Sequence, residues 1–67
     1  MKKSIIINGK RSRIQSSTIS GLFTERKINR TGIVIEVNGK VIHWTKFSRF
    51  CIKDGDNINI LHFSGGG

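Results

Sequence analysis

The chain has 67 residues, 36% of them hydrophobic, and its 12 Lys and Arg against 4 Asp and Glu give a formal net charge of +8. This length holds one domain, near the lower limit for chains that fold without disulfides or a structural metal. The single cysteine excludes an internal disulfide, and with two histidines it falls short of a four-ligand zinc site. We therefore expect a small domain that is stabilised by packing and binds no metal or other cofactor.

The N-terminal residues resemble a secretory signal only briefly, because Asn8-Gly9-Lys10 ends the apolar run at Ile7. No stretch approaches the length of a membrane span. We expect no membrane association, and a location in the cytoplasm, or in the plastid stroma if the gene is organelle-encoded.

The excess of positive charge makes nucleic acid or another polyanion the first partner to consider. The cations form two groups in the sequence, Lys2, Lys3, Lys10, Arg11 and Arg13, and then Lys46, Arg49 and Lys53. One basic face is possible, but an ordinary solvated surface gives the same count. A small basic nucleic-acid-binding module is therefore an alternative that rests on charge alone, and we regard nucleic acid as an unlikely partner.

Two β-hairpins are predicted by Asn8-Gly9 and Asn38-Gly39, because Asn-Gly between apolar stretches favours a two-residue type I′ turn. The paired segments are Lys3–Ile7 with Lys10–Ile14, and Ile33–Val37 with Lys40–Ile42. Alternation along these segments places their isoleucines on a common face that should meet a helix.

A short helix is predicted between the hairpins. Thr18 can cap its first amides, and Ile19, Leu22 and Phe23 have the spacing of a helix face that points inward. Gly21 weakens this helix by about 1 kcal/mol relative to alanine, so tertiary packing must hold it.

A single helical turn is expected at 45–50, where Phe47 and Phe50 lie three residues apart. Asp54-Gly55-Asp56 then forms a turn, and we interpret its two carboxylates as structural rather than catalytic.

The last strand, 57–63, alternates so that Ile58 and Ile60 lie on one face and Leu61 and Phe63 on the other. If the core is on the Ile58 side, two large apolar side chains are exposed beside a glycine run. Glycines can enter a channel too narrow for other residues, so the terminal carboxylate is a candidate reactive group.

The order of elements is strand, strand, helix, strand, strand, helical turn, strand, which is that of the ubiquitin-like β-grasp fold. This α+β fold has a mixed sheet of four to five strands packed on one short helix. An RNA-recognition fold has a second full helix, and an oligonucleotide-binding barrel usually lacks the early helix. We expect a β-grasp domain at 1–63 and a flexible C-terminal tail at 64–67.

Three segments occur in a recognisable order: IEVNGKVI at 35–42, IKDGD at 52–56 and ILHFSGGG at 60–67. Together they resemble the ThiS-type sulfur carriers of thiamine biosynthesis, with looser similarity at 6–9 and 18–23. The resemblance covers essentially the whole chain.

The resemblance implies that a partner adenylating enzyme, related to ubiquitin-activating enzymes, uses ATP to convert the Gly67 carboxylate into an acyl-adenylate. A sulfur donor system then leaves a thiocarboxylate, and thiazole synthase uses this sulfur for the thiazole ring. Gly65 and Gly66 form the flexible approach, and Leu61 and Phe63 contact the partners. The chain is thus a protein substrate rather than an enzyme, and sibling carriers for molybdopterin synthesis or tRNA thiolation remain alternatives.

The chain departs from the resemblance in two ways. Many relatives carry proline where His43 stands, and many are acidic where this chain is basic. The second difference implies that the partners are acidic around their docking sites or that the contacts are mostly apolar.

Four further side chains invite a functional interpretation. We interpret Cys51 as a buried structural cysteine rather than a sulfur-relay thiol. We take His43 and His62 as surface or strand residues rather than ligands, and Trp44 as either a contact residue or a partly buried lid of the core.

Overall fold

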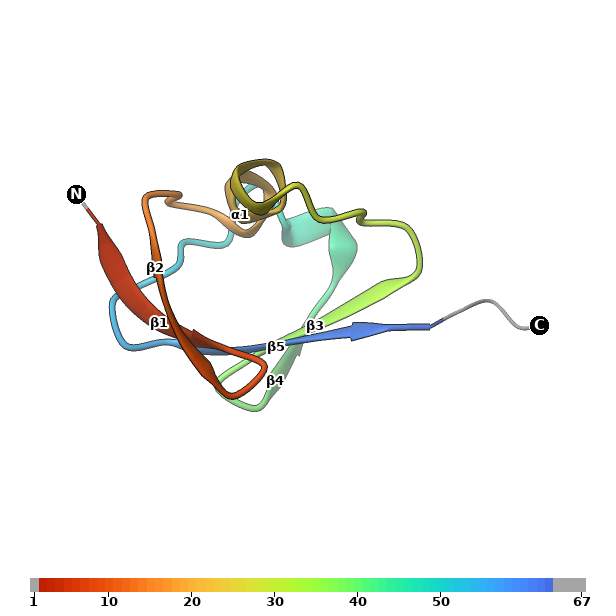
Figure 1. The fold of residues 1–67 in the computed structure, drawn as a ribbon. Coiled ribbons are helices and arrows are strands. Elements are labelled where there is room, and N and C mark those ends of the chain that lie inside the picture. Colours follow the sequence, from red (N-terminus) through yellow and green to blue (C-terminus); the bar gives the residue numbers. More distant parts are fainter. Residues whose placement is uncertain (1, 64–67) are drawn as a thin grey trace.

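The computed structural model describes residues 2–63, which form a five-stranded sheet with one α-helix across one face (Figure 1). The elements are β1 (Lys3–Ile7), β2 (Lys10–Ile14), α1 (Ile19–Arg26), β3 (Ile33–Val37), β4 (Lys40–Ile42), the 3₁₀ helix η1 (Trp44–Lys46) and β5 (Asn57–His62). The strand order is β2-β1-β5-β3-β4, with β1 and β5 parallel and the other neighbours antiparallel. This mixed sheet on one helix confirms the predicted β-grasp architecture.

Both predicted hairpins form with the expected bounds. The turn residues have positive φ angles, 49° and 82° at Asn8 and Gly9 and 53° and 84° at Asn38 and Gly39, as a type I′ turn requires. The asparagine side chains also reach β5. Asn8 Oδ1 accepts a hydrogen bond from the Ile60 amide at 2.7 Å, and Asn38 Oδ1 accepts one from the Asn57 amide at 2.9 Å. The two turns therefore help to hold β5 between the hairpins.

Helix α1 begins where the sequence predicts. The Thr18 hydroxyl oxygen accepts a hydrogen bond from the Gly21 amide at 3.1 Å, so Thr18 is the N-cap. The helix ends at Arg26 because Lys27 adopts the left-handed conformation, with φ of 54°. Its buried residues are Ile19, Leu22 and Phe23, as expected.

We expect Thr18→Ala to lower the free energy of unfolding by about 1 kcal/mol, because the Gly21 amide loses its acceptor. Chemical denaturation measures this change. Thr18→Ser keeps the hydroxyl and should retain most of the stability. An equal loss in both variants would show that the threonine methyl group, not the cap, provides the stabilisation.

The hydrophobic core lies between the sheet and α1 and is closed by the segment after β4. Its members are Ile5, Ile14, Ile19, Leu22, Phe23, Ile35, Val37, Ile42, Phe47, Ile52, Ile58 and Ile60. Phe23 and Phe47 pack edge to face, with ring centroids 5.4 Å apart and planes inclined by 74°. The predicted helical turn forms as η1, and Phe47 follows it directly. It starts at Trp44, one residue earlier than expected, and ends at Lys46, so the half-buried Phe50 lies outside it.

Glu25 has a structural role that the sequence did not predict. Its carboxylate accepts hydrogen bonds from the Gln15 amide at 3.1 Å, from the Ser16 amide at 3.0 Å and from the Ser16 hydroxyl. These bonds, the Ser16 hydroxyl first, lower the pKa of Glu25 below its ordinary value. The carboxylate thus fixes the link between β2 and α1 from the far end of the helix.

This lowered pKa predicts a pH-dependent stability. A carboxyl group with a lower pKa in the folded state stabilises the fold above its unfolded pKa and loses that contribution as pH falls through the folded pKa. The stability difference between the natural protein and Glu25→Gln should therefore be largest near neutral pH and should shrink as the pH falls below the ordinary pKa of glutamate. Urea denaturation over this range measures it, and a difference that stays constant contradicts the assignment.

Candidate functional site

Strand β5 divides its side chains between the core and the outer face of the sheet, which is the face away from α1. Ile58 and Ile60 are buried, whereas Leu61 is 44% exposed and Phe63, directly after the strand, is 62% exposed. The core is therefore on the Ile58 side, and the predicted exposure of Leu61 and Phe63 is confirmed. The strand itself ends at His62, one residue earlier than predicted.

Two valines extend this exposed apolar surface across the neighbouring strands. Val34 of β3 lies opposite Leu61 in the β3–β5 register and is half-buried. Val41 of β4 is 63% exposed and lies opposite Glu36. We call Val34, Val41, Leu61 and Phe63 the outer apolar patch. The alternation of β3 and β4 placed the two valines outward, but sequence reasoning did not connect them with β5.

The outer apolar patch lies at the end of β5 from which the chain continues to its C-terminus. The Phe63 amide donates a hydrogen bond to the Gly32 carbonyl at 2.8 Å. Gly65, Gly66 and Gly67, which the sequence assigns to a reactive tail, lie outside the described residues. Exposed apolar side chains that gather on one face are a candidate docking surface for another protein.

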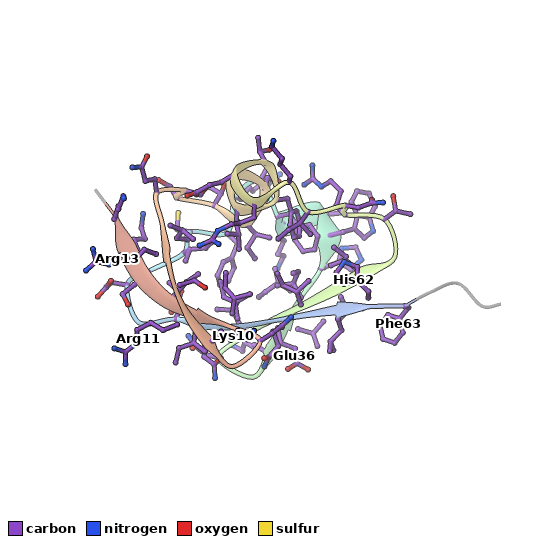
Figure 2. The ribbon with its side chains drawn as sticks, viewed as in Figure 1. Lys10, Arg11, Arg13, Glu36, His62 and Phe63 are labelled. Carbon is purple, nitrogen blue, oxygen red and sulfur yellow. The ribbon has the colours of Figure 1, made fainter. Side chains whose placement is uncertain are left out.

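The arginines of β2 are separated from Phe63 of this patch. Arg11 and Arg13 of β2 point away from the core at one end of the molecule, and Phe63 lies at the opposite end (Figure 2). The later cations Lys46 and Arg49 belong to η1 and the residues after it, on the α1 side of the sheet. Arg11 and Arg13 therefore lie on a different side of the sheet from η1.

The two turn carboxylates are bound within the fold. Asp54 accepts a hydrogen bond from the Ser4 amide at 2.7 Å. Asp56 accepts hydrogen bonds from the Asn38 side-chain amide at 3.0 Å and from the Lys53 amide at 2.8 Å. Their predicted structural role is confirmed, because both tie the turn before β5 to neighbouring segments.

The prediction that Cys51 is buried is wrong, because its side chain is exposed. Cys51 pairs with Thr18 in an isolated bridge, and Ile52 beside it takes the core position. Neighbouring residues in extended backbone point in opposite directions, so burying Ile52 exposes Cys51.

The remaining candidates lie on the surface. His43 caps η1, since its Nδ1 accepts a hydrogen bond from the Thr45 amide at 3.3 Å, and His62 is exposed. Trp44 is 71% exposed and so is not a lid of the core, a position that Phe47 fills. Within residues 2–63, His, Cys, Asp and Glu form no group that could hold a metal ion, and no helix has the length and hydrophobicity to cross a bilayer.

Comparison with known proteins gives a consistent result. The ThiS family matches residues 5–67 of this chain. A crystal structure of the thiamine biosynthesis protein ThiS from Geobacter metallireducens is 29% identical, covers 96% of this chain and 99% of that chain, and has a TM-score of 0.82. A solution NMR structure of a thiamine biosynthesis protein from the same organism is 29% identical, covers 96% of this chain and 87% of that chain, and has a TM-score of 0.74. None of the curated proteins matches the sequence.

Proposed function

The chain belongs to the ThiS family, and from this we propose that it is a sulfur carrier of thiamine biosynthesis whose Gly67 carboxylate is converted to a thiocarboxylate. The family match and the similarity to two structures of a thiamine biosynthesis protein from Geobacter metallireducens support the role in this pathway. The observation that carries the proposal is the outer apolar patch, which ends at Phe63, four residues before Gly67.

The chemistry begins at the carboxylate. One oxygen of Gly67 attacks the α-phosphorus of ATP held by an adenylating partner, pyrophosphate leaves, and an acyl-adenylate forms. The acyl carbon is now activated, because AMP is a far better leaving group than oxide. Hydrosulfide attacks that carbon, AMP leaves, and a thiocarboxylate remains. If the donor is a persulfide, its terminal sulfur displaces AMP to form an acyl disulfide, and a thiol reductant then cleaves the S–S bond to give the thiocarboxylate and a disulfide.

The scaffold contributes docking rather than catalysis in this scheme. The four residues after Phe63 can span at most about 14 Å, so the partner's nucleotide must lie close to the end of β5. A partner that covers Leu61 and Phe63 therefore brings the carboxylate within reach of the nucleotide. Apolar contact at this point also suits a carrier in which Arg11 and Arg13 lie at the opposite end of the molecule from Phe63.

The proposed partners are the adenylating enzyme, which consumes ATP, a sulfur donor system and thiazole synthase, which accepts the sulfur. Carriers for molybdopterin synthesis or tRNA thiolation use the same activation, and the ThiS family match favours the thiazole ring as the destination.

Mass spectrometry tests the proposal directly. The protein is incubated with ATP, sulfide and the adenylating enzyme of its own source, and we expect a mass gain equal to the replacement of one oxygen by sulfur. Fragmentation should place the gain at Gly67. Reactions without ATP serve as the control, and an unchanged mass in the complete reaction contradicts the proposal.

A further inference from the structure

Gly32 lies directly before β3, and its backbone contacts the end of β5. The Phe63 amide donates its hydrogen bond to the Gly32 carbonyl at 2.8 Å. This pair extends the β3–β5 register by one step beyond Ile33 and His62, which lie opposite each other. Within residues 2–63, it is the backbone hydrogen bond of the sheet nearest to the C-terminus.

The contact is possible only because residue 32 has no side chain. Gly32 has φ of +68°, and a Cβ atom there would lie 2.9 Å from the Phe63 carbonyl oxygen. Real Cβ atoms do not approach a backbone oxygen so closely, so one of the two segments would have to move. Because the Cβ atom would meet a backbone oxygen, no side-chain rotation relieves this contact.

Other glycines of the chain show that positive φ alone does not create this contact. Gly9, Gly39 and Gly55 have φ of +82°, +84° and +87°, and a Cβ atom at each would meet nothing within 4 Å. Gly39 lies in the turn between β3 and β4, at the other end of β3 from Gly32. The two ends of one strand therefore supply a test position and a matched control.

We propose that Gly32 is a positioning residue for the activation of Gly67, because it fixes the backbone of Phe63 from which the last four residues start. This inference rests on the proposed function. Since those residues reach about 14 Å at most, a displaced Phe63 moves the region in which the carboxylate can meet ATP. A misplacement of about 1 Å can reduce the rate of a positioned reaction by up to about 100-fold.

The effect should appear in the turnover rate more than in binding. Gly32→Ala leaves Leu61 and Val41 of the outer apolar patch in place but displaces Phe63, so KM should rise by less than in Phe63→Ala, which removes the ring. We expect kcat for adenylation to fall at least about tenfold, with a smaller rise in KM. Gly39→Ala should keep kcat within about twofold, although both alanines place an L-residue at positive φ and lose a similar stability of about 1–2 kcal/mol.

The experiment combines steady-state adenylation kinetics with amide hydrogen exchange of the free protein. Exchange at the Phe63 amide should accelerate in Gly32→Ala and not in Gly39→Ala. If Gly32→Ala does not fold, Gly32→Asn and Gly39→Asn replace the pair, because asparagine tolerates positive φ better and still carries a Cβ atom.

Each outcome assigns a failure to one proposal. If the natural protein is not adenylated, the proposed function is wrong. If it is adenylated and Gly32→Ala and Gly39→Ala have the same kcat, the positioning role of Gly32 is wrong, while the proposed function stands. Equal exchange of the Phe63 amide in both variants also overturns the role of Gly32, independently of any enzyme assay.

Discussion

Extension of the chain by one alanine after Gly67 is expected to abolish formation of the thiocarboxylate. The added residue moves the terminal carboxylate away from the position that the docked carrier presents to ATP, and it places a methyl group where the natural chain has only glycine. The loss should exceed about 100-fold, because adenylation depends on the placement of the reacting oxygen. Mass spectrometry of the complete reaction measures it.

The matched control carries the same alanine before Met1, where it leaves the terminal carboxylate unchanged. Both extended proteins should have the thermal stability of the natural protein, since neither alters residues of the core. Full conversion of the C-terminally extended protein would exclude the requirement for a terminal carboxylate on Gly67.

Phe63→Ala is expected to raise the KM of the adenylating enzyme for the carrier by about 30-fold, which corresponds to the loss of about 2 kcal/mol at an aromatic hot spot. Phe63 is 62% exposed, so its ring contributes little to the folded state and much to a surface that a partner can cover. The free energy of unfolding should change by less than about 0.5 kcal/mol. Enzyme kinetics with the carrier as varied substrate, together with chemical denaturation, check both values.

Trp44 provides the control for an exposed aromatic side chain elsewhere. It is 71% exposed and lies at the start of η1, on the α1 side of the sheet. Trp44→Ala should leave KM nearly unchanged. A large loss of stability in Phe63→Ala, or an equal rise of KM in both variants, would contradict docking at the outer apolar patch.

Local signals in the sequence gave the elements correctly. Asn8-Gly9 and Asn38-Gly39 predicted both hairpins, and Thr18 predicted the start of α1, because turns and caps depend on residues within a few positions of each other. Alternation in β5 predicted the exposure of Leu61 and Phe63 for the same reason. The family resemblance then connected that exposure with the glycine tail.

The full extent of the candidate site could not be predicted from the sequence. Val34 and Val41 belong to the outer apolar patch only because β3 lies between β5 and β4 in the sheet. A strand order is a property of the assembled fold, since any of several pairings satisfies the same alternation. The separation of Arg11 and Arg13 from Lys46 and Arg49 depends on the same assembly.

From its sequence alone this chain is recognisable as a β-grasp protein with two type I′ hairpins, one capped helix and an outward-facing Leu61 and Phe63. Only the tertiary structure showed three further features. These are the hydrogen bonds between Glu25 and the segment before α1, the exposure of Cys51, and the contact between Gly32 and Phe63. Glu25 and Gly32 contact residues that are distant in the sequence, and Cys51 is exposed because its neighbour Ile52 occupies the core position. Short-range propensity carries no information about such contacts, because they form only when the sheet and helix have packed together.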